Sequence, residues 1–108
     1  MPDTKEPVKV VNNPEEERYE AQVDGETGFL AYSQHGARIV LIHTEVPKQI
    51  EGRGVAGALA HYALEDARAQ NWSVIPSCPY VLSYIRRHPE YLPLVAESWR
   101  GKAESSAE

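Results

Sequence analysis

The sequence predicts a mixed α/β (α+β) fold, in which an antiparallel meander leads into a parallel β-α-β unit and a C-terminal helix follows. Three observations indicate this class. Short apolar or alternating segments separated by turn residues fill the first half of the chain. An alanine-rich segment with helical spacing follows at residues 55–70, and a short apolar segment at residues 73–76 comes directly after it. Because a helix joins the strands on either side of it, those two strands should be parallel with a right-handed crossover.

Each expected strand has a local signature. The first three are bounded by turn residues, and the fourth is apolar on both faces over most of its length, as in a central strand covered on each side. Their ranges are residues 8–14, 19–23, 27–34 and 38–46. The stretch from 19 to 46 therefore reads as a three-stranded antiparallel meander.

The expected helices are delimited by small residues and prolines. Alanines three and four positions apart give the first helix a small face that can lie close to the sheet: Ala56, Ala60, Ala63 and Ala67. Pro79 favours a second helix directly after Cys78, and Pro89 ends that helix. Residues 90–98 are expected to add one more helical turn.

The bulk composition limits the kinds of partner. The 108 residues fit one small domain, which we assign to residues 1–100, with residues 101–108 as a disordered tail. The net charge of −5 argues against nucleic acid as a partner, because phosphate binding needs a cationic face. No apolar run approaches the roughly 20 residues of a membrane span, so no membrane partner is expected. The single cysteine excludes an internal disulfide and fits a reducing cytoplasm, where we expect the protein.

The stretch from Gln49 to Ala56 joins the fourth strand to the first helix and predicts an anion site. The first amides of a helix have no intrahelical acceptors, and the helix dipole adds about half a positive charge there. Gly52 and Gly54 let the backbone curl so that consecutive amides face one point. We therefore expect the amides of residues 50–55 to hold a phosphate or diphosphate.

Two other phosphate motifs fit this loop poorly. Gly52, Gly54 and Gly57 also match the dinucleotide pattern G-x-G-x-x-G, but residues 47–51 separate them from the strand, and residues 72–77 contain no acid for a ribose. The chain is also too short for two mononucleotide-binding halves. A P-loop requires Gly-Lys-Ser/Thr after the glycines, which this loop does not have.

The pattern Gln49-x-x-Gly52-x-Gly54 before a helix is similar to the diphosphate loop of the GNAT superfamily, the acetyl-CoA-dependent N-acetyltransferases. The chain further resembles the short YjdJ-type subgroup in four ordered runs that span about residues 17–95: residues 43–47, 51–54, 75–81 and 85–91. The order of the four runs makes the resemblance stronger than the loop alone.

The resemblance implies a compact GNAT-like mixed sheet in which the strands at 38–46 and 73–76 splay apart and admit acetyl-CoA between them. It also implies that an amide near Glu45 or Val46 faces the thioester carbonyl. Lys48 and Arg53 would add charge near the diphosphate. The cofactor-binding residues that it implies are Thr44, Val46, Gln49, Ile50, Glu51, Gly52, Arg53, Gly54, Val55 and Cys78, with no metal.

Two side chains at the end of the fourth strand are candidates for proton transfer. Strand alternation places Ile39, Leu41, His43 and Glu45 on one face. His43 and Glu45 could accept the proton of an attacking amine, directly or through one water. The alternative is structural, with His43 satisfied by a neighbour and Glu45 paired with a cation.

Cys78 has two interpretations as well. A free cysteine is often a small core residue, and here it would line the thioester pocket. It also precedes a proline-initiated helix, whose dipole favours thiolate, so it could form an acetyl-cysteine intermediate. Tyr80, Tyr84 and Tyr91 are candidates for returning a proton to coenzyme A, with core packing as the alternative for each.

The leading hypothesis is an acetyl-CoA-dependent N-acetyltransferase that acts on an amine acceptor. The sequence does not identify the acceptor, because the chain lacks the two helices between the first strands and the extra C-terminal strands of full-length GNAT domains. A small amino compound, a protein lysine and water all remain open. Two alternatives are a non-catalytic acyl-CoA-binding module and an interaction domain without cofactor binding, and the intact glycine loop counts against the second.

Overall fold

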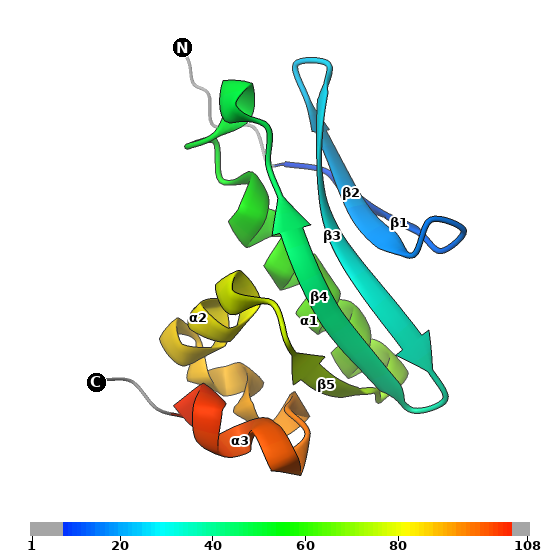
Figure 1. The fold of residues 1–108 in the computed structure, drawn as a ribbon, viewed down its shortest axis with the longest axis vertical. Coiled ribbons are helices and arrows are strands. Elements are labelled where there is room, and N and C mark those ends of the chain that lie inside the picture. Colours follow the sequence, from blue (N-terminus) through cyan, green and yellow to red (C-terminus); the bar gives the residue numbers. More distant parts are fainter. Residues whose placement is uncertain (1–7, 105–108) are drawn as a thin grey trace.

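The computed structural model describes residues 8–104, and its centre is a five-stranded sheet (Figure 1). The strands lie in sequence order; those from β1 to β4 are antiparallel to their neighbours, and β5 is parallel to β4. Their bounds are Val10–Asn13 (β1), Arg18–Val23 (β2), Glu26–His35 (β3), Arg38–Glu45 (β4) and Ser73–Pro76 (β5). The mixed sheet confirms the predicted fold class. The meander has four strands rather than three, because β1 pairs with β2.

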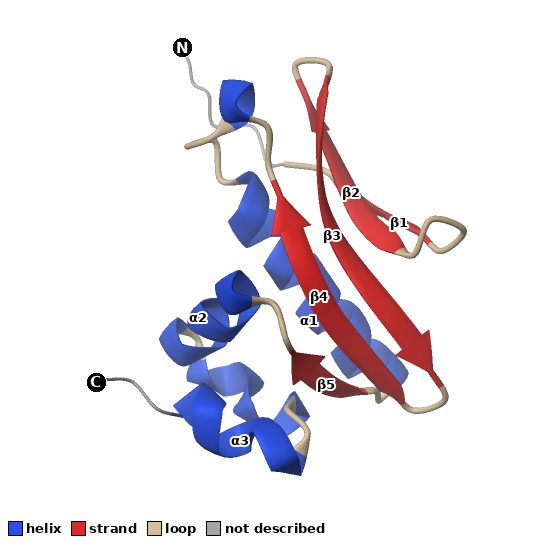
Figure 2. Ribbon diagram, in the orientation of Figure 1, coloured by secondary structure: helices blue, strands red, loops and turns tan. Residues whose placement is uncertain are grey.

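The helix α1 (Val55–Gln70) connects β4 to β5 and packs on one face of the sheet (Figure 2). Its covered side chains are small or aliphatic: Val55, Leu59, Ala60, Ala63, Leu64 and Ala67. Tyr19 of β2 is fully buried against this helix, and its hydroxyl donates a hydrogen bond to Asp66 Oδ2 at 2.7 Å. Burial and the neighbouring carboxylate raise the pKa of Tyr19. The space between α1 and the sheet is therefore the core of the domain.

Three short helices follow β5 and lie beside its edge of the sheet (Figure 1). Val74 of β5 forms a parallel bridge with Val95, and its carbonyl accepts a bond from the Ala96 amide at 2.8 Å. These contacts cover the outer edge of β5. The helices are α2 (Pro79–Arg87), the 3₁₀ helix η2 (Pro89–Leu94) and α3 (Glu97–Glu104).

The prediction of a disordered tail from residue 101 is wrong for residues 101–104, which form the last turn of α3. Ala103 is buried there. The guanidinium of Arg86 donates to the Lys102 carbonyl from Nε at 3.0 Å and from Nη2 at 2.9 Å. These bonds satisfy a carbonyl at a helix end, where intrahelical donors are lacking. Residues 105–108 lie outside the described residues.

The pairing of β3 with β4 contains a β-bulge. Ala31 lies opposite His43, but Tyr32 lies opposite Leu41, so Ile42 is an extra residue in β4. An extra residue reverses which side chains point to which face of the sheet. Leu41 therefore lies on the buried face, whereas the side chains paired with Ala31 and Phe29 lie on the other.

Among the described residues, no helix crosses the sheet face opposite α1 over β3 and β4 (Figures 1 and 2). We name this surface the open face. Strand register places these six side chains on it: Arg18, Glu20, Phe29, Ala31, His43 and Glu45. The prediction that His43 and Glu45 share a face with Leu41 is therefore wrong, and the cause is the bulge.

Candidate active site

The loop between β4 and α1 is anchored by one apolar side chain and shaped by two glycines. The 3₁₀ helix η1 (Lys48–Ile50) follows β4, and Ile50 is buried in the core. Gly52 and Gly54 have φ angles of 82° and 81°, in the left-handed region that favours glycine. A Cβ at either position would meet nothing within 4 Å, so the backbone conformation alone explains why glycine occupies them.

The amides of this loop divide into two groups. Those of Ile50, Glu51 and Arg53 donate to carbonyls of the same segment, at 3.0, 3.2 and 3.3 Å. The expectation that every amide from 50 to 55 faces a ligand is therefore wrong for these three. Five other amides have no acceptor within residues 8–104: those of Gly52, Gly54, Val55, Ala56 and Gly57. They lie at the positive end of the α1 dipole, where an anion is stabilised.

One of the two cations at this loop, Arg53, is paired with an acid in the turn of the β2–β3 hairpin. Arg53 Nη1 lies 2.9 Å from Asp24 Oδ2, in the turn between β2 and β3. Both side chains are substantially exposed, at 47% for Arg53 and 72% for Asp24. Lys48 is also exposed. The two cations expected to support a diphosphate are thus at the loop, and one of them is engaged by Asp24.

Gly28 of β3 lets the start of α1 approach the sheet closely. A Cβ on Gly28 would lie 2.8 Å from Val55 Cγ1 and 3.3 Å from the Glu45 carbonyl oxygen. A side chain at this position would therefore displace the first helical residue. Sequence reasoning did not assign Gly28 to the site, although a glycine inside an expected strand is a recognised sign of close backbone approach.

The pairing of β4 with β5 ends before β4 does, and the chain after β5 turns away into α2 (Figure 1). They pair from Arg38↔Ser73 to Leu41↔Pro76, and the Cys78 amide adds a last bond to the Leu41 carbonyl at 2.8 Å. Beyond this point, β4 runs on to its end without a strand partner on that side in the described chain. We name the place where the pairing between these two segments ends the fork.

Thr44 and Cys78 face each other across the fork. The hydroxyl oxygen of Thr44 lies 3.2 Å from Cys78 Sγ, and the cysteine is only 2% exposed. Cys78 is the residue immediately before α2, which begins at Pro79 as predicted. The structure thus brings together two residues that the resemblance assigned to the cofactor.

His43 and Glu45 contact each other at the end of β4, on the open face. Their Nε2 and Oε2 atoms are 3.2 Å apart, and their side chains are 55% and 62% exposed. The His43 ring lies edge-on to the ring of Phe29, with centroids 6.3 Å apart. The structure therefore places this candidate acid–base pair on the opposite sheet face from α1, where both side chains are exposed to solvent.

The three candidate tyrosines lie in different surroundings. Tyr91 is buried, and its hydroxyl donates to Glu65 Oε2 at 2.6 Å and lies 3.2 Å from His61 Nδ1. Burial and the Glu65 carboxylate raise the pKa of Tyr91, and burial raises that of Tyr84. The Tyr80 hydroxyl lies beside the first turn of α1, 3.5 Å from where a Cβ on residue 57 would be. Tyr80 is thus the one of the three that lies at the loop.

Residues 8–104 contain neither a metal-binding cluster nor a membrane-spanning helix. No group of three or more His, Cys, Asp and Glu side chains in this part of the chain is placed to hold a metal ion. No helix in it combines the length and the apolar character needed to cross a membrane.

Comparison with known proteins identifies the family. Residues 18–94 match the family model described as GCN5-related N-acetyl-transferase. The chain is also 31% identical over 86 residues to "Protein NATD1" of Mus musculus, covering 77% of this chain and 78% of that protein. The Homo sapiens "Protein NATD1" is 31% identical over 86 residues, with 77% and 76% covered. The expected YjdJ-type subgroup stays a prediction. The chain carries an acetyltransferase-like domain and belongs to the GCN5-related N-acetyltransferase (GNAT) family.

Proposed function

We propose that this protein is an acetyl-CoA-dependent N-acetyltransferase that acts on a primary amine. One observation supports the proposal most. Five amides without acceptors in the described chain gather at the start of α1, next to the fork between β4 and β5. An anion-binding loop beside an open strand edge suits a long ligand with a diphosphate at one end of its extended arm.

The residues of the loop fit a diphosphate. The amide donors carry no competing side chain at Gly52, Gly54 and Gly57, and the helix dipole favours negative charge there. Gly28 keeps β3 clear of Val55, so the first turn of α1 sits close to the end of β4. Bound acetyl-CoA would supply an acetyl thioester in the fork, and the unpaired edge of β4 would bind its extended arm.

Residues around the fork would carry out the proton transfers and stabilise the developing charge. His43 and Glu45 would accept the proton that the amine must lose before it attacks, since they are in contact and open to solvent. A backbone amide near Glu45 or Val46 would donate to the carbonyl oxygen as negative charge develops on it. The Tyr80 hydroxyl is the candidate for protonating the departing thiolate.

We assign Cys78 to the wall of the fork rather than to a nucleophilic role. Its thiol is almost fully buried and lies against the Thr44 hydroxyl. A nucleophile must present its sulfur to the thioester, and the burial of this one favours a packing role. Direct transfer to the amine therefore needs no acetyl-cysteine intermediate.

Titration calorimetry with acetyl-CoA tests the binding half of the proposal. Gly54→Ala forces a left-handed φ on a residue with a side chain, and it should weaken binding about tenfold. Gly36→Ala is the matched control, because Gly36 also has a positive φ and open space around it, but lies in the β3–β4 turn. Equal losses for the two variants, or no binding by the wild type, would contradict the proposal.

Release of free thiol from acetyl-CoA tests the transfer half. Release that depends on an added amine supports a transferase, whereas tight binding without turnover supports the acyl-CoA-binding module. Mass spectrometry after incubation with acetyl-CoA alone tests the role of Cys78. An acetyl adduct that Cys78→Ala abolishes together with turnover would refute direct transfer.

A further inference from the structure

A surface hollow lies where the pairing of β4 with β5 begins, at the other end of that pairing from the fork. Its volume is about 690 Å³, within the roughly 300–1,000 Å³ of sites that hold small molecules. The start of α3 forms one wall, because the Ala96 amide donates to the Val74 carbonyl at 2.8 Å and holds this segment beside β5 (Figure 1). We name it the distal hollow, and its lining includes His35, Arg38, Ser73, Ile75, Ala96 and Ser98.

Strand register builds the floor of the distal hollow. Arg38 of β4 lies opposite His35 of β3 and pairs with Ser73 of β5, so the three side chains form one row across the sheet. The next residues along β4 and β5, Ile39 and Val74, are fully buried in the core. Because strand side chains alternate between the two faces, the row points to the face opposite α1. Residues that are distant in sequence thus converge on one side of the sheet.

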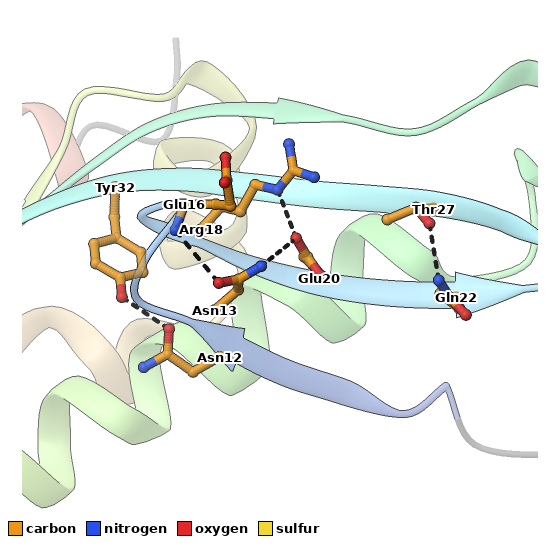
Figure 3. Close-up of polar contacts among 8 residues, drawn as sticks. All are labelled: Asn12, Asn13, Glu16, Arg18, Glu20, Gln22, Thr27 and Tyr32. Carbon is orange, nitrogen blue, oxygen red and sulfur yellow. Dashed lines mark hydrogen bonds and ion pairs between the residues drawn. The ribbon is translucent and has the colours of Figure 1, made fainter.

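Arg38 is the cation of the distal hollow, and its guanidinium has no hydrogen-bond or ion-pair partner within residues 8–104. The other arginines in this part of the chain are engaged. Arg18, for example, donates to Glu20 Oε2 at 2.7 Å (Figure 3). Each of the rest donates a side-chain hydrogen bond as well: Arg53, Arg68, Arg86, Arg87 and Arg100. The exposed guanidinium of Arg38 is therefore available to an acceptor from outside the described chain.

The rest of the lining suits an anion with an apolar body. No Asp or Glu is among the described residues that line the hollow. His35, Ser73 and Ser98 offer further hydrogen-bond donors. The aliphatic side chain of Ile75 offers an apolar surface beside them. A guanidinium presents its donors in a planar fork that matches a carboxylate or a phosphate. An ammonium group would meet the like charge of Arg38 with no lining carboxylate to offset it, so the hollow does not suit an amine.

From this arrangement we infer that the distal hollow is a second ligand site, which binds a small organic anion through a carboxylate or phosphate head on Arg38 and a short apolar body on Ile75. The inference goes beyond the proposed function and does not depend on it. β4 rises about 3.3 Å per residue, so Arg38 and Thr44 of the fork are separated by roughly 20 Å. A bound anion would join the β3–β4 turn, β5 and the start of α3, which the chain brings to the hollow separately.

Amide chemical shifts in NMR spectra of the full-length protein test the inference. Sodium butyrate, butyl phosphate and butylammonium chloride have similar short chains and differ in the head group. We expect at least one of the two anions to shift the amides of residues 35–38, 73–75 and 96–98 saturably, and butylammonium to leave them unchanged. Binding of butyrate alone would indicate a carboxylate head, and binding of butyl phosphate alone a phosphate head.

Three variants assign the binding to the hollow. Arg38→Gln removes the charged donor and should weaken anion binding at least about tenfold. Lys9→Gln is the matched control, because it changes the net charge equally at an exposed position outside the hollow, and it should bind as the wild type does. Ser98→Leu fills part of the hollow from an exposed position and should also weaken binding. Urea unfolding of each variant shows that the fold is retained.

The inference is overturned if neither anion gives saturable shifts, or if sodium chloride at the same concentration reproduces them, since the effect is then general screening. Equal affinity of Arg38→Gln and the wild type would also contradict it. Displacement of the anion by acetyl-CoA would assign the hollow to the donor site and refute a separate one. Saturable shifts in a protein that does not bind acetyl-CoA would support the inference and contradict only the proposed function.

Discussion

Replacing Gly28 with alanine tests whether close packing against β3 positions the start of α1. The added Cβ would lie 2.8 Å from Val55 Cγ1 and 3.3 Å from the Glu45 carbonyl oxygen, both closer than ordinary contacts. Val55 is 2% exposed and is the first residue of α1, so it has little space in which to move. Overpacking of this kind costs about 1–3 kcal/mol of unfolding free energy. For a chain of this length, that corresponds to a Tm lower by at least about 4 °C.

A double-mutant cycle identifies the cause of that loss. Val55→Ala removes the Cγ1 atom that the new methyl group would meet, so Gly28→Ala should cost at least about 1 kcal/mol less in that background. Urea unfolding measures the free energies, and calorimetry measures the acetyl-CoA affinity, which should fall with Gly28→Ala alone. Gly101→Ala is the control, because its Cβ would meet nothing within 4 Å and it lies in α3, outside the loop. If Gly28→Ala cost the same free energy in both backgrounds, the packing argument would be refuted.

Three further predictions concern the contacts around the site. Asp24→Asn removes the acid that pairs with Arg53, so that Arg53 is free to contact the diphosphate. Exposed ion pairs contribute up to about 1 kcal/mol, so the affinity for coenzyme A should rise by up to about fivefold at low salt. In calorimetry the gain should vanish at high salt and be absent for pantetheine; a gain that persists would point to a structural effect instead. The Tyr91 hydrogen bond holds the pKa of Glu65 below its ordinary value, so it stabilises the fold above that ordinary value and the stabilisation is lost as pH falls through the folded-state pKa. Urea midpoints at neutral and acid pH should therefore differ less for Tyr91→Phe than for the wild type, and an equal difference would contradict the assignment. Arg86→Ala should accelerate amide hydrogen exchange in α3 but not in α1, because only α3 loses a bond at its end.

Elements with local signals could be predicted from the sequence. The helix expected at 55–70 is α1 with the same bounds, because Gly54 and Asn71 flank it in left-handed conformations that end regular structure. The start of α2 at Pro79 follows from the preference of proline for a first helical turn. The glycine loop could also be predicted, because glycine adopts its left-handed φ angles without strain.

Features that depend on distant partners could not be predicted. Nothing about Ile42 distinguishes it from other strand residues, and the bulge exists only in its register with β3. The Arg53–Asp24 pair joins residues 29 positions apart, so it requires the folded hairpin. The sequence of the last turn of α3 is typical of a solvated tail. Only Ala103 is buried there, and the hydrogen bonds to the Lys102 carbonyl come from Arg86 of α2.

The bulge has a physical consequence that links the core to the chemistry. With unbroken alternation, the carboxylate of Glu45 would point with Leu41 toward α1, where burying an unpaired charge costs several kcal/mol. The extra residue in β4 keeps Leu41 in the core and turns Glu45 to solvent within one strand. It also turns Thr44 toward Cys78, so that Thr44 and Glu45 lie on opposite faces of the sheet. One strand thus joins an apolar core position to an exposed acid–base pair through a single extra residue.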